Sequence, residues 1–269
     1  MSEKSVPIAL TIAGSDPSGG AGIQADLKTF TALGVYGASV ITALTAQNTM
    51  GVTGVHKVPA DFIRAQFEAV AVDLNFNAIK TGMLADEETV NLVSELLLRI
   101  KPLHLVVDPV MVATSGDKLL ESSAIESMRI RLIPLASLIT PNLPEAAELL
   151  GADLAQTDAE MVAQARALLG LGCRAVLLKG GHGSGSEAID YLVTKDEIGR
   201  FVRPRIETSN THGTGCTLAA AITAGLAHGM TLDAAVRQGK DFVWHALHSG
   251  AGLAIGHGSG PVDHLFKLR

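Results

Sequence analysis

The segment Thr208–Thr217 holds the residue types from which a site for phosphate transfer could be built. It reads T-S-N-T-H-G-T-G-C-T, and the small apolar residues that follow predict a helix over Cys216–Ala227. The first N–H groups of a helix lack partners within it, and the helix dipole adds partial positive charge there. Glycine lets an anion approach the backbone, so a phosphate cradle is expected here, with an ordinary turn before a buried helix as the alternative. This candidate anion loop consists of Gly213, Thr214, Gly215 and Cys216.

Cys216 lies where a helix N-terminus would act on its thiol. That position can lower a thiol pKa from about 8.5 by one or more units, which predicts some thiolate near neutral pH. A buried, inert cysteine is the alternative, and Cys173 fits that description better. The chain has only these two cysteines, without C-x-x-C spacing, which argues against a disulfide framework and against a zinc site built on cysteines.

Two carboxylates and a lysine follow separate predicted strands. Asp108 stands in V-V-D-P-V-M, Glu145 in T-P-N-L-P-E-A and Lys179 in L-L-K-G-G-H-G. Mg²⁺ takes few protein oxygens and keeps several waters while bridging phosphates, so two such carboxylates suffice for a metal site. Lys179 is placed to reach nucleotide phosphates. The alternatives are a strand-end turn for Asp108, a residue beside a helix dipole for Glu145 and an exposed lysine for Lys179.

Two further segments could contact a small ligand. Gln47, in T-A-Q-N-T, carries a donor and an acceptor on one planar amide, which suits a planar amino-heterocycle, although a polar loop amide is the alternative. The first loop, G-S-D-P-S-G-G-A-G-I-Q-A-D, lacks the G-K-[ST] ending of a Walker A motif and a regular G-x-G-x-x-G. Its glycines allow close backbone approach before a helix from about Ala21, and Asp16 is either a ligand contact or a turn residue.

The elements that must position these residues alternate between strand-like and helix-like patterns. Continuous apolar strands between amphipathic helices predict one α/β domain over residues 1–269, with a mostly parallel sheet covered on both faces. Ligands then lie beyond the carboxyl ends of the strands. The expected parallel strands are Ile8–Ala13, Ser39–Leu44, Ala78–Thr81, Leu105–Asp108, Leu138–Thr140 and Ala175–Leu178, and Ala188–Val193 with Arg200–Arg203 form an antiparallel edge hairpin. The expected helices are Ala21–Leu33, Asp61–Asp73, Glu87–Ile100, Ser122–Leu132, Ala159–Leu169, Cys216–Ala227 and Leu232–Ser249.

Composition narrows the class of protein. The net charge is −6 without a basic cluster, and aromatic residues make up 4%, which argues against nucleic acid as a partner. The apolar run Val6–Ala13 is too short to span a membrane and leads into a glycine loop instead of a cleavage site, so a cytoplasmic protein is expected. The nine histidines show no H-x-x-x-H or H-E-x-x-H pair, and we therefore expect no zinc site.

Taken together, these motifs resemble the hydroxymethylpyrimidine/phosphomethylpyrimidine kinases of thiamine biosynthesis, within the ribokinase-like superfamily. The resemblance runs from A-L-T-I-A-G-S-D-P-S-G-G-A-G-I-Q-A-D-L-K-T-F through T-A-Q-N-T, K-T-G-M-L, V-V-D-P-V-M, T-P-N-L-P-E-A and L-K-G-G-H to T-H-G-T-G-C-T. It implies a three-layer αβα sandwich, usually dimeric. It further implies that ATP and Mg²⁺ are used to phosphorylate 4-amino-5-hydroxymethyl-2-methylpyrimidine and then its monophosphate, with a monovalent cation as a further candidate cofactor.

The same resemblance assigns roles to residues of this chain. Gln47 would bond the aminopyrimidine ring, in a pocket lined by Gly14, Asp16, Ala21, Met83 and Val110. Glu145 and Asp108 would organise Mg²⁺, while Asn142, Lys179 and Thr208 would face the phosphates and the nucleotide. The wider superfamily has an aspartate as general base where this chain has Cys216. We therefore expect Cys216 to contact the hydroxymethyl group, with a role as base less secure, because positioning dominates phosphoryl transfer.

Three other functions fit parts of the sequence. A pyridoxal kinase shares most of the scaffold, but its substrate has no exocyclic amine to pair with Gln47. A cysteine-nucleophile enzyme would need His212 to activate Cys216, and adjacent residues rarely provide that geometry. A non-catalytic vitamin sensor would not require the carboxylates, the lysine and the anion loop together.

Overall fold

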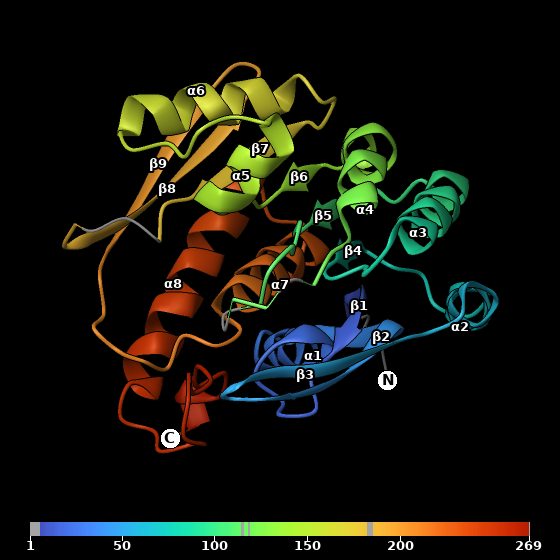
Figure 1. Ribbon diagram of the computed structural model, residues 1–269, viewed down its shortest axis with the longest axis horizontal. Coiled ribbons are helices and arrows are strands. Elements are labelled where there is room, and N and C mark those ends of the chain that lie inside the picture. Colours follow the sequence, from blue (N-terminus) through green and yellow to red (C-terminus); the bar gives the residue numbers. More distant parts are fainter. Residues whose placement is uncertain (1–5, 114–115, 118, 182–184, 269) are drawn as a thin grey trace, which may run out of the picture.

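A single mixed sheet runs through the computed structural model, which describes residues 6–113, 116–117, 119–181 and 185–268 (Figure 1). Within these residues the strand order is β3-β2-β1-β4-β5-β6-β7-β8-β9. Neighbours from β2 to β7 pair in parallel, whereas β3 at one end and β8 and β9 at the other pair antiparallel. The strands are β1 (Ile8–Ser15), β2 (Tyr36–Asn48), β3 (Gly51–Lys57), β4 (Ala78–Thr81), β5 (Leu105–Val107), β6 (Leu138–Ile139), β7 (Ala175–Lys179), β8 (Glu187–Thr194) and β9 (Ile198–Pro204).

Helices cover both faces of this sheet, as the resemblance implied. The long helices are α1 (Gly22–Ala32), α2 (Ala60–Ala71), α3 (Glu87–Ile100), α6 (Asp158–Leu169), α7 (Thr214–Ala227) and α8 (Leu232–Gly250). Shorter ones are α4 (Ser122–Ser127), α5 (Leu143–Leu150), the π-helical turn η1 (Met128–Leu132), and the 3₁₀ turns η2 (Ile133–Leu135) and η3 (Phe266–Leu268). Helices α1, α7 and α8 pack in one hydrophobic cluster and α2 to α6 in the other. The structure is therefore a three-layer αβα sandwich.

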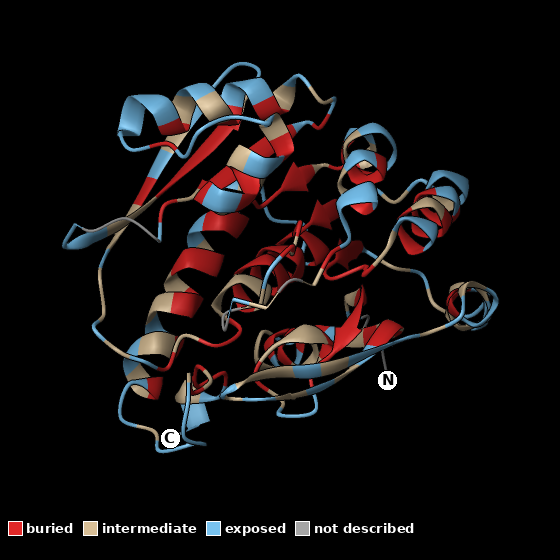
Figure 2. Ribbon diagram, in the orientation of Figure 1, coloured by how far each residue is buried: buried red, intermediate tan, exposed pale blue. Residues whose placement is uncertain are grey.

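Period-2 alternation along the strands divides the core between the two faces. Ala9 and Val106 face the layer that contains α7, while Leu10 and Val107 face the layer that contains α3. Both faces are covered, so the central strands read as continuous apolar runs. Helix α7 is buried on all sides from Thr217 onward, which explains its run of small residues (Figure 2).

Most expected elements are confirmed, including the antiparallel hairpin, which is β8 with β9. One predicted boundary was wrong: the strand expected over Ser39–Leu44 does not end before Gln47, which rules out the alternative of a loop amide. Strand β2 continues to Asn48 as a two-stranded ribbon with β3, where Gln47 pairs with Val52. Strand β3 was not predicted because its side chains are mostly exposed and it contains two glycines, so it lacks the apolar run used to recognise the other strands.

A fully buried ion pair joins three elements below the carboxyl ends of the strands. Lys80 Nζ of β4 lies 2.8 Å from both carboxylate oxygens of Asp26 in α1, and both side chains are 0% exposed. Thr11 of β1 donates its hydroxyl to the same carboxylate at 2.6 Å. Burial alone would lower the pKa of Lys80, but attraction to Asp26, with contributions from Cys216 and Asp108, raises it above its ordinary value. The ammonium is therefore charged.

We predict that Lys80→Met lowers the free energy of unfolding by about 3–5 kcal/mol, because the Asp26 carboxylate is left buried without a counter-ion. The double change Lys80→Met with Asp26→Leu is expected to restore most of that loss. Urea denaturation followed by circular dichroism measures both values. Lys57→Met, which removes a largely exposed lysine from Asp86 and Glu121, serves as the control and is expected to cost under about 1 kcal/mol. A double variant as unstable as Lys80→Met would contradict the electrostatic explanation.

Candidate active site

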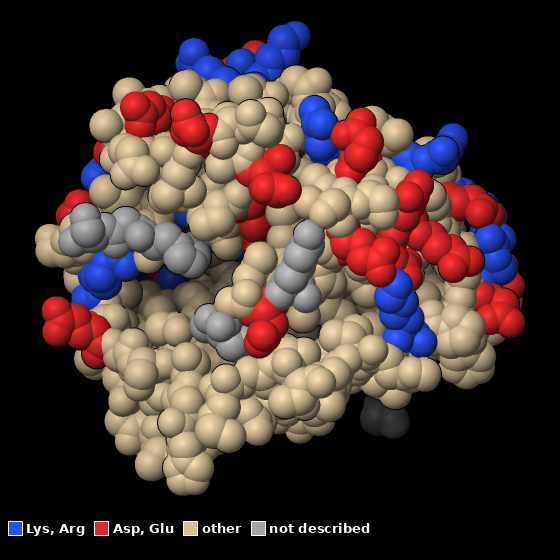
Figure 3. All heavy atoms as spheres, viewed as in Figure 1, with Lys and Arg blue, Asp and Glu red and all other residues tan. Residues whose placement is uncertain are grey.

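A cavity of about 850 Å³ lies at the carboxyl ends of the parallel strands. This is the edge of the sheet where strand order reverses, since β1 has β2 on one side and β4 on the other. The space-filling view shows a hollow near the middle of the face, with most of the charged side chains above it and a largely uncharged area below (Figure 3). The predicted site residues that line the cavity are Gly14, Asp16, Ala21, Gln47, Met83, Asp108, Val110, Asn142, Glu145, Lys179, Gly213, Thr214, Gly215 and Cys216.

Thr208 is the predicted site residue that does not line this cavity in the described part of the chain. Its hydroxyl accepts a hydrogen bond from the Asn210 amide at 3.0 Å and so shapes the approach to the anion loop. Its role toward a nucleotide stays a prediction.

The anion loop is the first turn of α7. Gly213 caps the helix with φ of 80°, and a Cβ there would overlap the carbonyl oxygen of Gly20, so only glycine fits. Helix α7 begins at Thr214, two residues before the start expected from the sequence. Within the described residues the amides of Gly215 and Cys216 donate no hydrogen bond, which leaves two N–H groups available to an anion at the cavity wall.

The pKa of the Cys216 thiol is shifted upward, whereas its position at a helix N-terminus predicted a downward shift. Burial raises it from 9.0 to about 11, and the negative charges of Asp26 and Asp108 add to this, against opposing effects of Lys80 and of the Gly22 amide. The expectation of thiolate near neutral pH was therefore wrong, because desolvation outweighs the helix terminus. His212 makes its side-chain bond to Asp16 at 2.8 Å, which gives no support to a His212–Cys216 nucleophile pair.

Lys179 lies between the two predicted metal carboxylates. Its Nζ is 3.0 Å from Asp108 Oδ1 and 3.9 Å from Glu145 Oε2. Thr140 donates its hydroxyl to Asp108 at 2.9 Å, and Asn142 forms a capping box with Glu145 at the start of α5. Sequence spacing alone could not show this triangle, since it depends on the adjacency of β5, β6 and β7.

Two buried carboxylates share one ammonium here, so negative charge is left over. Burial raises the pKa of Glu145 from 4.5 to about 7, and the charge of Asp108 adds to it, against the attraction of Lys179. A further cation would relieve this, and hard carboxylate oxygens suit Mg²⁺, so the residues fit that ion. The described residues hold no group of three or more His, Cys, Asp or Glu side chains able to bind a metal alone. Phosphate oxygens and water would have to complete the coordination.

A third buried ion pair lines the cavity and was missed by sequence reasoning. Lys240 of α8 is 2.5 Å from Asp190 of β8, whose other carboxylate oxygen accepts from the Gly180 amide at 3.0 Å. Both residues line the cavity. Neither stands in a recognisable motif, and only the packing of α8 beside the β8–β9 hairpin brings them together. Lys240 is thus a positive group on the cavity wall that phosphates could contact.

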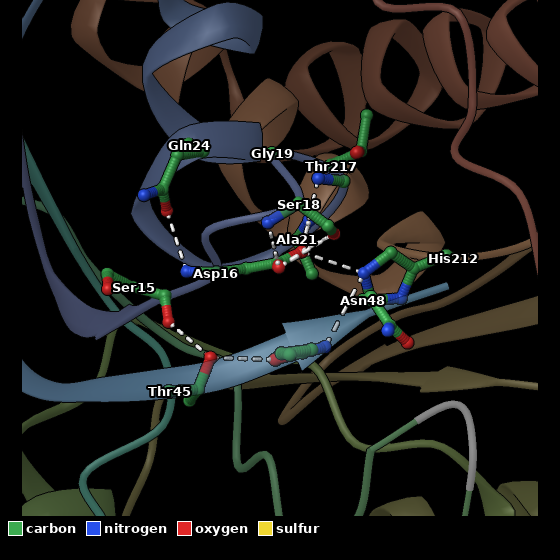
Figure 4. A network of polar contacts seen from close by, with 12 residues as sticks. Ser15, Asp16, Ser18, Gly19, Ala21, Gln24, Thr45, Asn48, His212 and Thr217 are labelled. Atoms are coloured by element: carbon green, nitrogen blue, oxygen red, sulfur yellow. Dashed lines mark hydrogen bonds and ion pairs between the residues drawn. The ribbon is translucent and has the colours of Figure 1, made fainter. Parts of the chain in front are cut away.

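Asp16 organises the first loop around one carboxylate (Figure 4). Its Oδ2 accepts from the amides of Gly20 and Ala21 at 3.1 and 2.8 Å and from His212 at 2.8 Å, while Ser18 donates to its Oδ1. Burial alone would raise its pKa, but these hydrogen bonds lower it from 3.8 to about 2. Asp16 is thus a turn residue that also holds the anion loop through His212.

We predict that Glu145→Gln flattens the pH dependence of stability when no metal or nucleotide is present. Between about pH 4.5 and pH 7 the folded protein binds more protons at Glu145 than the unfolded chain, so wild-type stability falls as pH rises through this window. The variant should become relatively more stable by about 1–3 kcal/mol at pH 8. Thermal melts across pH 4–8 measure this, with exposed Glu207→Gln as control. Parallel curves for Glu145→Gln and wild type would contradict it.

We predict that Cys216 reacts slowly with iodoacetamide at pH 7, because its thiol is protonated there. In a Cys173→Ser background the alkylation rate should keep rising from pH 8 to above pH 10. Mass spectrometry of timed samples gives the rate. A plateau near pH 7–8 would show that the helix N-terminus controls the thiol after all.

Comparisons with known proteins agree with the fold and with the family that the sequence motifs resemble. The family model for phosphomethylpyrimidine kinase matches residues 16–263. A hydroxymethylpyrimidine/phosphomethylpyrimidine kinase from Salmonella typhimurium is 54% identical, over 95% of this chain and 96% of that one. Among solved structures, a phosphomethylpyrimidine kinase from Clostridium difficile superposes with a TM-score of 0.80 at 45% identity, covering 89% of this chain and 99% of that one. An ADP complex of Bacillus subtilis pyridoxal kinase has a TM-score of 0.91 at 35% identity, covering 98% and 99%. The chain belongs to the phosphomethylpyrimidine kinase family.

Proposed function

We propose that this chain uses ATP to phosphorylate the hydroxymethyl group of 4-amino-5-hydroxymethyl-2-methylpyrimidine and then phosphorylates the resulting monophosphate to the pyrophosphate. The observation that carries the proposal is that the Gln47 amide, the anion loop and the Asp108–Lys179–Glu145 cluster line one cavity. A planar aminopyrimidine, a transferring phosphate and a nucleotide tail each find a complementary group there. The printed names of the similar kinases support the same substrates.

In this proposal the residues that line the cavity have different tasks. Gln47 binds the ring edge, where Met83 and Val110 supply apolar surface. Lys179 and Lys240 line the same cavity, each beside a carboxylate, so phosphate binding there would need the further cation that offsets Asp108 and Glu145. The free amides of Gly215 and Cys216 stabilise charge on the transferred phosphoryl group, which favours the transition state over the bound substrates.

Cys216 acts in this proposal by contact and not as a base. A thiol with a pKa of about 11 is protonated at neutral pH and so has no free site for the substrate proton. Phosphoryl transfer gains mainly from positioning and electrostatics, so a protonated thiol packed beside the hydroxymethyl group is sufficient.

Mg²⁺ would be held by Asp108 and Glu145 and would neutralise phosphate charge when bound. The chain's own contribution is to keep both carboxylates in place. Thr140 and Lys179 orient Asp108, and the Asn142 capping box orients Glu145.

Mass spectrometry of products tests the proposal. Incubation with Mg·ATP and the hydroxymethylpyrimidine should yield the monophosphate followed by the pyrophosphate. Gln47→Ala should raise the KM for the pyrimidine much more than the KM for ATP, since the amide touches only the ring. Turnover of pyridoxal or pyridoxine with no pyrimidine product would move the assignment to pyridoxal kinase. Monophosphate alone would remove the second step from the proposal.

Further expectations rest on the family resemblance. We propose that residues 1–269 act as one kinase domain, because one sheet and two continuous core layers run through the described residues. A homodimer, a cytoplasmic location and a monovalent-cation requirement are also expected. In the described residues no helix is both long enough and apolar enough to cross a membrane.

A further inference from the structure

The side-chain amide of Gln47 lies between two hydrogen-bonding groups that determine how it is turned. On one side Thr45 Oγ1 is 3.1 Å from Gln47 Oε1, and on the other His212 Nε2 is 3.5 Å from Gln47 Nε2. Oxygen and nitrogen of an amide have nearly the same shape, so hydrogen-bond chemistry decides which is which. The partners of His212 and Thr45 determine where the hydrogens of these two side chains lie.

The proton on His212 is fixed by Asp16. The Asp16 carboxylate is ionised, since its pKa is lowered to about 2, and it can only accept. Because Asp16 Oδ2 is 2.8 Å from His212 Nε2, that nitrogen must carry a hydrogen (Figure 4). This holds for the neutral and for the protonated imidazole. An N–H of Gln47 would then face an N–H of His212.

Turning the Gln47 amide by 180° removes this conflict. The Gln47 carbonyl oxygen then lies beside His212 Nε2, whose single hydrogen goes mainly to Asp16, and one Gln47 N–H faces the Thr45 oxygen. The Thr45 hydroxyl donates to the Ser15 carbonyl oxygen at 2.8 Å, which leaves its oxygen free to accept from Gln47. In this orientation no two donors face each other, because Thr45 donates to Ser15, His212 donates to Asp16 and one Gln47 N–H points at the Thr45 oxygen.

His212 itself is held firmly enough to impose this orientation. It is 5% exposed, and its backbone amide donates to the Gly260 carbonyl at 3.0 Å. A Cβ on Gly20 would overlap the imidazole ring, so the first loop packs directly against it. The segment 257–259 also holds the tip of the β2–β3 ribbon through three hydrogen bonds to Thr49.

We propose that His212, positioned by Asp16, fixes the Gln47 carbonyl toward the anion loop and thereby selects a 4-aminopyrimidine over a 4-oxopyrimidine. This inference rests on the proposed function. In the amino compound N3 accepts and the exocyclic amine donates, whereas in the oxo compound N3–H donates and the oxygen accepts. Only the amino compound matches a fixed Gln47 amide. Its amine then lies on the side of His212, so the neighbouring C5 hydroxymethyl group points toward residues 213–216.

The orientation can be measured without any substrate. In protein labelled with ¹⁵N-glutamine, the Gln47 side-chain signal is assigned by its loss in Gln47→Leu. We expect its Nε2 protons to show stronger nuclear Overhauser effects to Thr45 than to the His212 ring. Stronger effects to His212 would overturn the proposal, whether or not the protein phosphorylates pyrimidines.

Selectivity gives the second measurement. The ratio of kcat/KM for the hydroxymethylpyrimidine to that for its 4-oxo analogue should fall about tenfold or more in His212→Leu, because the amide becomes free to turn. His56→Leu makes the same chemical change at an exposed site on β3 and should keep the wild-type ratio. An unchanged ratio in folded His212→Leu would overturn the proposal. If wild type uses neither pyrimidine, the proposed function fails, and the orientation is still decided by the spectra.

Discussion

The ion pair between Lys80 and Asp26 is the interaction on which the rest of the site depends. It lies at the switch point of the sheet and ties β4, α1 and, through Thr11, β1 into one unit. Two charges removed from water are tolerable only while each keeps the other. The pair thereby fixes α1 against β4 and β1. The Lys80 ammonium also interacts with Cys216 and Asp108, so its charge reaches the candidate anion loop and one of the two proposed metal ligands.

Positive and negative side chains are paired around the cavity. Three lysines each contact a carboxylate, and at least one member of every pair lines the cavity. The low dielectric of the buried ends strengthens these interactions, and it also explains the shifted pKa values of Glu145 and Cys216. A site built in this way has its charged groups in place before any ligand arrives, and in the proposed function a bound cation offsets Asp108 and Glu145 so that polyphosphate can enter.

The sequence predicted the fold and most of the cavity wall because both depend on local patterns. Apolar runs predicted the parallel strands. Motifs at the ends of these strands identified residues such as Asp108 and Lys179, which a parallel sheet brings to one edge. The rest depends on distant pairings that no local pattern carries. Three such pairs can be recognised only once the order of the strands and the packing of the helices are known: Lys80 with Asp26, Lys240 with Asp190, and His212 with Asp16. The sign of the Cys216 pKa shift required its burial, which the sequence does not display.

Residues 257–260 near the end of the chain are hydrogen-bonded to two distant parts of it. Segment 257–259 donates to Thr49, and the Gly260 carbonyl accepts from the His212 amide. The proposed ring pocket combines Gln47 of β2, which is synthesised early, with His212, which is synthesised late, and residues 257–260, which bond to Thr49 and His212, are synthesised last. Because domains fold as they leave the ribosome, the first half of the chain can form its strands while the pocket is still incomplete. Ability to bind the pyrimidine ring is thus a property that the chain acquires only near the end of its synthesis.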